Sequence, residues 1–284
     1  MGSLTGIRRR IKSAKNISQI TRAMEMVSAS KMRKAQDSAL STRPFTEKLG
    51  DMISRLSAGS VAKSHGLAGL RPEKNILVVL SSTTKGLCGG LNVNLYRGFR
   101  DLVEANHSAE FSVVVLGTKA KWTMKGKDIA IAAKFSDLGE TVTFEESRSV
   151  SSFLIDTFLK GEFDSVYMLY PKFLTTLTNE ITAQKLLPIL PPENSDTVPT
   201  DYTIEPSGGE LISMLMPYQL EMSVYQILLE SRATEHSARM VAMKNASDNA
   251  KELIGNLTLD YNQARQSQVT SELLDVTTAR MALE

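Results

Sequence analysis

Apolar residues recur at spacings of three and four at both ends of the chain, a pattern typical of helices that pair along one stripe. The predicted amino-terminal stripe is Leu4, Ile7, Ile11, Ala14, Ile17, Ile20, Met24 and Val27. The carboxyl-terminal stripe is Leu211, Leu215, Tyr218, Met222, Tyr225 and Leu229, and it resumes at Met243, Ala246, Ala250, Leu253, Leu257, Tyr261 and Ala264. We therefore expect a long antiparallel coiled coil of an N-terminal helix over 1–57 and a C-terminal helix over 209–284.

Two features interrupt the second stripe. The same register meets Arg232, His236 and Arg239, so either the stripe drifts around the helix or the seam contains a polar layer. Pro217 costs about 3 kcal/mol inside a helix and removes a backbone donor, which predicts a kink there or a helix start near Tyr218.

The length of these helices implies a partner. At 1.5 Å per residue, a helix from about Ser3 to Leu56 is roughly 80 Å long and one from about Gly209 to Met281 roughly 110 Å. Neither fits inside a compact domain of this chain's size, so part of the longer helix is expected to bury its stripe elsewhere.

The middle of the chain has the pattern of an α/β domain. Short, β-branched apolar runs at 75–82, 111–117, 129–133 and 165–170 are typical of buried parallel strands, and 173–187 is expected to add an edge strand or hairpin. Helical patterns occupy 91–105, 119–125 and 149–160. The alternation predicts a central Rossmann-like open α/β domain over 75–190, between linkers at 58–74 and 191–208.

Charge is polarised along the chain, although the net charge is only +2. Residues 1–34 hold nine Lys or Arg and one acid, whereas residues 209–284 hold ten Asp or Glu and six Lys or Arg. Opposite charge favours pairing of the ends, but exposed ion pairs are worth only about 0–1 kcal/mol each. The basic face also suits nucleic acid or an anionic membrane. No aromatic precedes Phe45 to stack on bases, which favours a protein-facing surface.

Motifs for catalysis or cofactor binding are absent. One cysteine, Cys88, excludes an internal disulfide, and three scattered His form no metal-ligand spacing. Phosphate-loop, dinucleotide and zinc-protease motifs are missing, so no cofactor or metal is expected. The run KGLCGG at 85–90 follows the first strand, where a doubly wound fold binds a nucleotide. A tight turn that needs glycines for positive φ is the favoured alternative. No run of 18 apolar residues predicts a membrane span, and a transit peptide is not expected because the stripe begins at Leu4.

Four sequence blocks occur in one order along the chain. Residues 7–13 read IRRRIKS and 20–36 read ITRAMEMVSASKMRKAQ; residues 86–92 read GLCGGLN; residues 236–246 read HSARMVAMKNA; residues 261–266 read YNQARQ. Together they resemble the gamma subunit of bacterial, proton-transporting F-type ATP synthase. Three departures are residues 276–282, which lack the family's Gly-Ala-rich sequence, Lys85, where the family usually has Arg, and Pro217.

The resemblance implies a central rotor stalk. Its paired terminal helices would turn inside a hexameric ring of alpha and beta subunits, and its α/β domain would contact the epsilon subunit and the membrane c-ring. Proton-driven rotation would then drive the catalytic beta subunits through successive conformations. It further implies one copy per complex, no active site, cofactor or nucleic-acid partner of its own, and a peripheral position on the cytoplasmic face of the bacterial membrane.

The resemblance also assigns site residues. Contacts with beta subunits are expected at Arg22, Met24, Arg265, Gln266, Thr270 and Glu272. The central-domain turn is expected at Gly86, Cys88, Gly89 and Gly90, with a structural role. Two other classes remain: a small-molecule enzyme that dimerises through helical arms, which predicts a nucleotide response in the central domain, and a coiled-coil nucleic-acid binder with steep salt dependence.

Overall fold

The computed structural model describes residues 4–56, 65–119, 129–136, 138–189 and 207–283. These residues divide into two compact units. The helical unit comprises the described parts of 1–28 and 239–284, and the sheet unit those of 29–238. Helices α1 (Leu4–Leu56) and α6 (Gly208–Met281) each contribute residues to both units.

The sheet unit holds a five-stranded sheet of order β3-β2-β1-β4-β5. Strands β1 (Asn75–Ser81), β2 (Glu110–Leu116), β3 (Ala130–Phe135) and β4 (Ser165–Phe173) are parallel, and β5 (Asn179–Leu187) is an antiparallel edge strand. The predicted strands and the Rossmann-like α/β class are thereby confirmed. The helix expected at 119–125 falls almost entirely outside the described residues.

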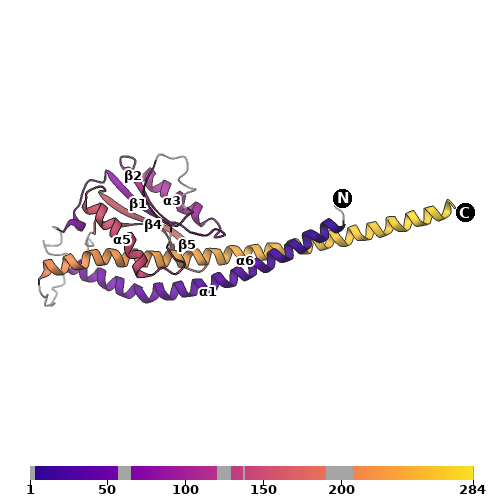
Figure 1. Cartoon of the computed structure of the whole chain (residues 1–284), viewed down its shortest axis with the longest axis horizontal. Helices are drawn as coiled ribbons and strands as arrows, with labels where there is room; N and C mark the ends of the chain where they lie inside the picture. Colours follow the sequence, from indigo (N-terminus) through magenta and orange to yellow (C-terminus); the bar gives the residue numbers. More distant parts are fainter. Residues whose placement is uncertain (1–3, 57–64, 120–128, 137, 190–206, 284) are drawn as a thin grey trace. The chain divides into compact units, whose positions relative to one another are not determined.

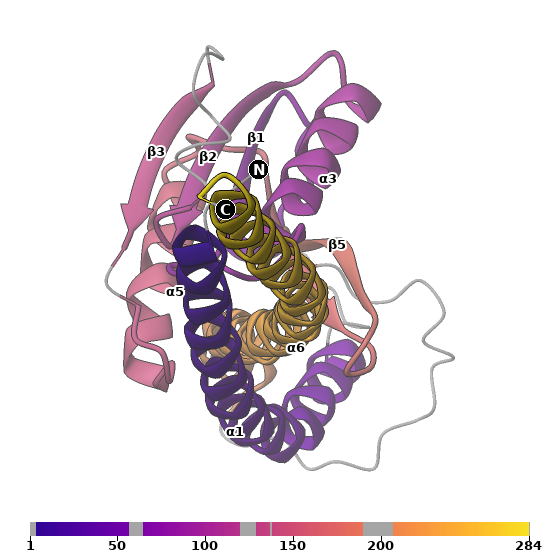
Figure 2. The ribbon, with the colours of Figure 1, turned by 90° about the vertical axis from the view of Figure 1, so that its right-hand side faces the viewer.

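Helices cover both faces of the sheet (Figures 1 and 2). Helix α3 (Leu91–Ala105) packs Leu95 and Phe99 against Ile76 and Val78 on one face. On the other face, α5 (Phe144–Leu159) and α6 share a second core with β1, β2 and β4. The buried lengths of β1, β2 and β4 are apolar runs because helices cover both faces of the sheet at these strands.

Helix α5 begins five residues before the predicted start at 149. Thr143 accepts a hydrogen bond from the Glu146 backbone N–H, and the Glu146 side chain accepts one from the Thr143 N–H. This capping box satisfies two of the helix's unpaired backbone donors, which favours a helix start at this point.

Within the sheet unit, α6 carries two apolar stripes. The predicted stripe packs Met222, with Leu215 and Tyr225, against Leu49 and Ile53 of α1. A second stripe, which the sequence analysis missed, joins the core beneath the sheet through Ile212, Met216, Leu220, Val224 and Ile227. The helix starts at Gly208 and runs through Pro217, so the start predicted near Tyr218 is wrong. Burial of Met216 and Leu220 offsets the cost of the proline.

The two helices run antiparallel in the sheet unit, as predicted. Gln226 donates to the Ala39 carbonyl at 3.1 Å, and the ring centroids of Phe45 and Tyr218 lie 6.0 Å apart. Residue numbers therefore rise along α1 as they fall along α6.

In the helical unit, the seam departs from the prediction on α1. Leu4, Ile7, Ile11 and Ala14 are buried or half-buried as expected, but the seam then continues through polar residues, Ser18, Thr21, Glu25 and Ser28. Ile17, Ile20 and Val27 are each more than half exposed, so their predicted place in the seam is wrong. Strict alternation of four and three from Ala14 leads to Ser18 and Thr21. The Ser247 hydroxyl reaches the Ser18 carbonyl at 3.4 Å, a close approach that small side chains permit.

On α6 of the same unit, Met243, Ala250 and Leu257 are buried as predicted. Leu253 is 46% exposed, and Ile254 is half-buried in its place. The reason is again the four-and-three spacing of coiled-coil core positions: the step from Ala250 is four residues, to Ile254, and not three, to Leu253.

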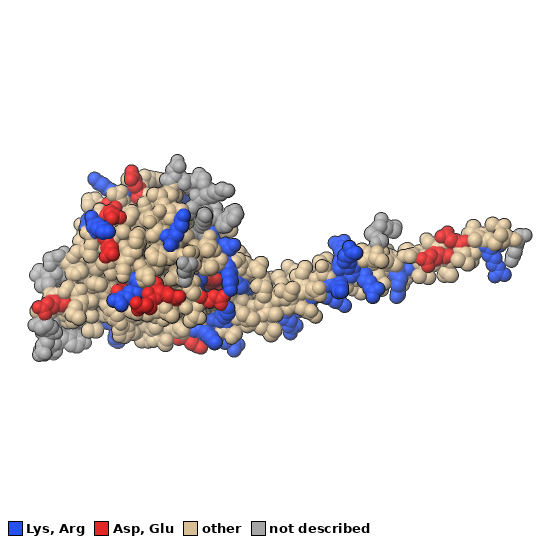
Figure 3. Space-filling view, in the orientation of Figure 1, with Lys and Arg blue, Asp and Glu red and all other residues tan. Residues whose placement is uncertain are grey.

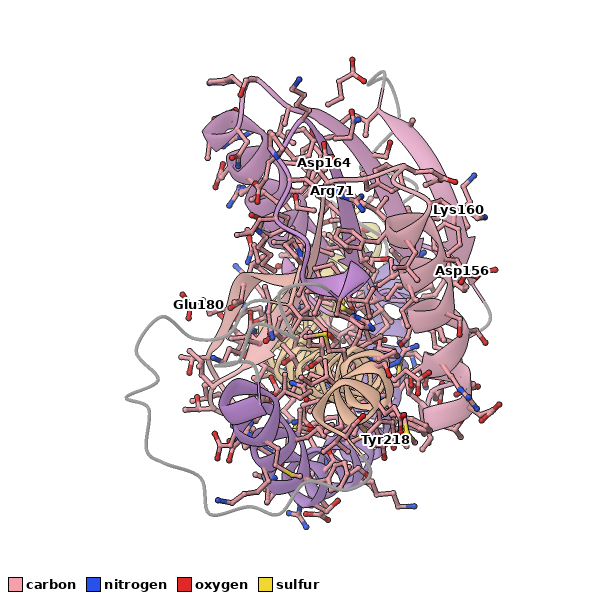
Figure 4. All side chains as sticks on the ribbon, turned by 90° about the vertical axis from the view of Figure 1, so that its left-hand side faces the viewer. Arg71, Asp156, Lys160, Asp164, Glu180 and Tyr218 are labelled. Carbon is pink, nitrogen blue, oxygen red and sulfur yellow. The ribbon has the colours of Figure 1, made fainter. Side chains whose placement is uncertain are left out.

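Residues 65–74, at the end of the first expected linker, pack on the sheet unit. Leu67 is fully buried, and Arg71 stacks over Phe158 and donates to its carbonyl at 3.2 Å. Asp164 accepts from the backbone N–H groups of Lys74 and Asn75 (Figure 4). This segment therefore belongs to the folded part of the unit. Most of the second linker lies outside the described residues.

Candidate functional site

A polar segment of α6 is buried inside the sheet unit. Residues 226–237 are all less than a tenth exposed, although most of them are polar or charged: Gln226, Glu230, Ser231, Arg232, Thr234, Glu235, His236 and Ser237. Of the two alternatives for this register, the polar layer is confirmed.

The polar side chains of this layer form hydrogen bonds and ion pairs with several elements. Arg232 donates to Glu235 at 2.7 Å and to the Leu138 carbonyl at 3.2 Å. Glu230 accepts from Arg43 of α1 at 3.0 Å. Burial, with Glu230 nearby, raises the pKa of Tyr170 on β4 to about 12. Since buried charges are costly unless paired, the layer fixes α6 in one register against the sheet and α1.

This layer also fills the place where such a sheet would hold a ligand. In open α/β sheets, ligands bind outside the carboxyl ends of the strands where the strand order reverses, here between β1 and β4. That crevice is lined by Ser81, Ser82, Gly117 and Pro171 from the strand ends and by Leu228, Ser231, Arg232 and Glu235 from α6. It retains about 10 Å³, room for about one water molecule. A nucleotide does not fit there.

The turn after β1 has the geometry of a tight structural turn. Leu87 and Gly89 have φ of 63° and 61°, in the left-handed region that favours glycine. Gly90 precedes the first residue of α3. The Asn92 side chain donates to the Thr83 hydroxyl at 2.8 Å and to the Cys88 sulfur at 3.4 Å. The turn is therefore tied internally, which favours the structural interpretation of Gly86, Cys88, Gly89 and Gly90.

The predicted contact residues near the end of α6 are exposed. Arg265, Gln266, Thr270 and Glu272 all face solvent in the helical unit. Their described hydrogen bonds stay within the helix: Thr270 donates to the Gln266 carbonyl, and Glu272 accepts from Gln268. On α1 of the same unit, Arg22 is exposed and Met24 is half-buried.

These polar residues flank an apolar stripe that the sequence analysis did not single out. At about 100° per residue, Val269, Leu273 and Val276 project from one face of α6, with Arg265 and Glu272 along one side and Gln266 and Thr270 along the other. All three apolar side chains are about half or more exposed. The end of α6 therefore presents one amphipathic surface to solvent.

The break in the heptads could have revealed this surface. The seam with α1 ends at Ala264, and the positions that would continue it are polar: Gln268, Ser271, Asp275 and Thr278. The apolar residues beyond Ala264 lie on another face. This part of α6 is consequently not a continuation of the same coiled coil.

Basic side chains are exposed on α1 of the helical unit. Arg8, Arg9, Arg10, Lys12 and Lys15 are all exposed on α1 of the helical unit. Figure 3 shows Lys and Arg along that unit, together with a group of Asp and Glu toward the end of α6. On the sheet unit, acidic and basic side chains are mixed on the face in view. The basic surface predicted from the sequence is therefore exposed.

Neither a metal site nor a membrane span is found in the described part of the chain. Over those residues, no group of three or more His, Cys, Asp or Glu is placed to hold a metal ion. Their helices also lack a stretch long and apolar enough to cross a bilayer.

Comparisons with known proteins agree with this geometry. The family model described as ATP synthase matches residues 3–283. The ATP synthase gamma chain of Pelotomaculum thermopropionicum is 40% identical over the full length of both chains, and that of Roseiflexus castenholzii is 41% identical over all of this chain and 99% of its relative. The chain belongs to the ATP synthase gamma-chain family.

Solved structures extend the match to the fold. The central stalk of the Tetrahymena thermophila mitochondrial ATP synthase aligns with a TM-score of 0.63 at 25% identity, over 80% of this chain and 99% of that one. A chain of the Euglena gracilis enzyme aligns with a TM-score of 0.66 at 16% identity, over 99% and 95%; this second likeness concerns the fold alone. The gamma chain described here is thus a subunit of a rotary ATP synthase, with the role of its central stalk.

Proposed function

We propose that this gamma chain couples proton-driven rotation of a membrane c-ring to conformational cycling of catalytic beta subunits, for ATP synthesis or hydrolysis. The observation that carries the proposal is the amphipathic, unpaired end of α6. Exposed Val269, Leu273 and Val276, flanked by polar groups, form the kind of face that becomes buried against another protein.

We assign contact with beta subunits to Arg22, Met24, Arg265, Gln266, Thr270 and Glu272. An exposed polar group forms hydrogen bonds at one rotor angle and releases them at another. Only such a difference in contact free energy between angles transmits work from one site to another. The basic surface around Arg8–Arg10 suits an acidic lining of the ring.

We further propose that the chain has no active site of its own. The crevice that would hold a nucleotide retains about 10 Å³ behind Arg232 and Glu235. This filling argues against the enzyme alternative, for which ATP should raise the melting temperature of the isolated chain. Retention of duplex DNA that falls steeply with salt would instead favour the nucleic-acid alternative.

The proposed assembly contains one copy of this chain. Its partners are a hexameric ring of alpha and beta subunits, an epsilon subunit and the c-ring, at the cytoplasmic face of a bacterial membrane. The chain is then a peripheral subunit.

The test is the double variant Arg265→Ala/Gln266→Ala in the assembled enzyme in vesicles. We expect ATP-driven proton pumping to fall relative to ATP hydrolysis, while the circular dichroism of the isolated chain is unchanged because both side chains are exposed. Arg100→Ala, which alters an exposed arginine on α3 of the sheet unit, is the matched control. Equal pumping in the double variant and the control would contradict the assigned role.

A further inference from the structure

A cleft of about 450 Å³ opens in the sheet unit beside Lys31 and Lys34 of α1. Ala35, Val142 and Leu229 contribute apolar lining, and Arg232 and His236 of α6 also line the cleft. The volume is in the range of small-molecule sites, which combine apolar walls with a few convergent polar groups.

Glu140 lies at this cleft and joins two separate elements. One carboxylate oxygen accepts from Lys31 of α1, and the other accepts from Lys85 in the turn after β1. The two ammonium groups hold the pKa of Glu140 down, at about 2. The carboxylate therefore stays ionised at neutral pH and acts as a bridge between α1 and the sheet.

The bridge is accessible to solutes. The side chains of Lys31, Glu140 and Lys85 are 40%, 43% and 67% exposed, and exposed ion pairs of this kind are individually weak. A soluble anion can reach both ammonium groups without opening the core of the unit.

The lining favours an anion once the carboxylate leaves. Apart from Glu140, the lining then holds Lys31 and Lys34 against one carboxylate, Asp37, and Lys85 is the second ammonium group that contacts Glu140. Phosphate offers several oxygens and more charge than a carboxylate, and lysine is a common phosphate ligand.

We propose that Lys31 and Lys85 form a binding site for a phosphate-bearing anion at the mouth of this cleft, which Glu140 occupies as a tethered competitor. Binding displaces Glu140 and releases the segment 138–142 from α1. The site is separate from the contact surface assigned to the end of α6, and its test needs no rotation.

The first experiment is calorimetric titration of the full-length chain with inorganic phosphate, at constant ionic strength set with chloride. Removing the competitor should expose the site, so Glu140→Gln should bind phosphate at least tenfold more tightly than the unchanged chain. Adding Lys31→Gln or Lys85→Gln to that variant should abolish the gain. Glu104→Gln, which removes an exposed carboxylate paired with Arg100 on α3, should leave binding unchanged.

A parallel titration with ATP in the absence of magnesium distinguishes the source of the phosphate. ATP that binds Glu140→Gln more tightly than phosphate does, and loses that binding when Lys31→Gln is added, assigns the cleft to a nucleotide; equal or weaker binding assigns it to the free ion. ATP binding that persists with Lys31→Gln lies outside this cleft and overturns the assigned site. Binding of neither ligand to Glu140→Gln overturns the proposal, as does an equal gain in Glu104→Gln.

Hydrogen exchange on the unchanged chain gives a readout without substitution. Phosphate should speed exchange in 138–142 severalfold beyond chloride at the same ionic strength. An identical effect of the two salts would mean simple screening and would also overturn the site.

Discussion

Two segments of α6 contrast within one continuous helix. Residues 226–237 are mostly polar yet buried all round, whereas residues 265–283 include six large apolar side chains and are exposed all round. From polarity alone, the first segment would be expected at the surface and the second in the core. Packing partners determine the burial instead: the sheet and α1 enclose the first segment, and no part of the described chain covers the second.

The contrast separates attachment from function. The buried segment fixes the helix to the rest of the chain through paired charges, which specify one arrangement more than they add stability. The exposed segment retains apolar surface that a monomer gains nothing from exposing. The contacts that complete it are therefore expected from other subunits.

The largest effect expected from this contrast is in amide exchange of the isolated chain. Amides of 226–237 should exchange only on global unfolding, whereas those of 268–283 should exchange as a fraying helix does, since a single unsupported helix is marginal in water. A ratio of protection factors of about a thousandfold or more is expected, measured by hydrogen exchange with mass spectrometry. Comparable protection in the two segments would break the comparison.

The elements that were predicted correctly from the sequence are those that pack in a single apolar environment. Strands β1, β2 and β4 were found because both faces of the sheet are covered there, so their buried lengths are apolar runs, as in NILVVLS of β1. Helix α3 packs one stripe on one face of the sheet, and its predicted bounds, 91–105, are those observed.

For helices that pack against two different elements, the sequence predicted only one of the two contact faces. Helix α6 packs Met222 toward α1 and Met216 toward the sheet, and a search for one stripe finds one of the two. The seam at Ser18 was missed because small polar side chains let the two helices approach closely there, so no large apolar residue marks the contact. The amphipathic face at Val269 and Leu273 was not singled out, since its partner is not in this chain.

The next effect concerns paired charges. Glu235→Ala leaves Arg232 buried without its carboxylate partner at 2.7 Å, which should cost about 3–5 kcal/mol of unfolding free energy. Asp248→Ala removes the partner of Lys251 in an exposed pair at the same i,i+3 spacing on the same helix. That second change should not shift the urea midpoint. Equal shifts in the two variants would show that burial does not distinguish the pairs.

A slightly smaller effect is expected from matched leucines. Leu228 is 3% exposed in the core beneath the sheet, and Leu273 is 62% exposed. Leu228→Ala should lower the unfolding free energy by about 2–5 kcal/mol, because it removes buried methyl groups and leaves a cavity. Leu273→Ala should change it by no more than about 0.5 kcal/mol. The measurement is urea unfolding of the isolated chain, followed by circular dichroism.

In the assembled enzyme we expect the opposite order for coupling: Leu273→Ala should impair it more than Leu228→Ala does. Leu273→Ala removes surface that we assign to contact with other subunits, so it should reduce proton pumping per ATP hydrolysed. A loss of stability without loss of coupling in Leu273→Ala would mean that this leucine packs within its own chain.

The smallest effect tests whether alanine at an exposed glycine stabilises α6 in the helical unit, as it does in an isolated helix. Gly255 lies inside α6, and a Cβ built there meets nothing within 4 Å. Gly255→Ala should therefore stabilise the isolated chain by about 0.5–1 kcal/mol, because alanine loses less backbone entropy on helix formation. Thermal unfolding should show a small rise in Tm, and a fall would mean that position 255 has a close neighbour in solution. If the same variant assembles poorly with its partner subunits, the open space at Gly255 is where another chain comes close to the helix backbone.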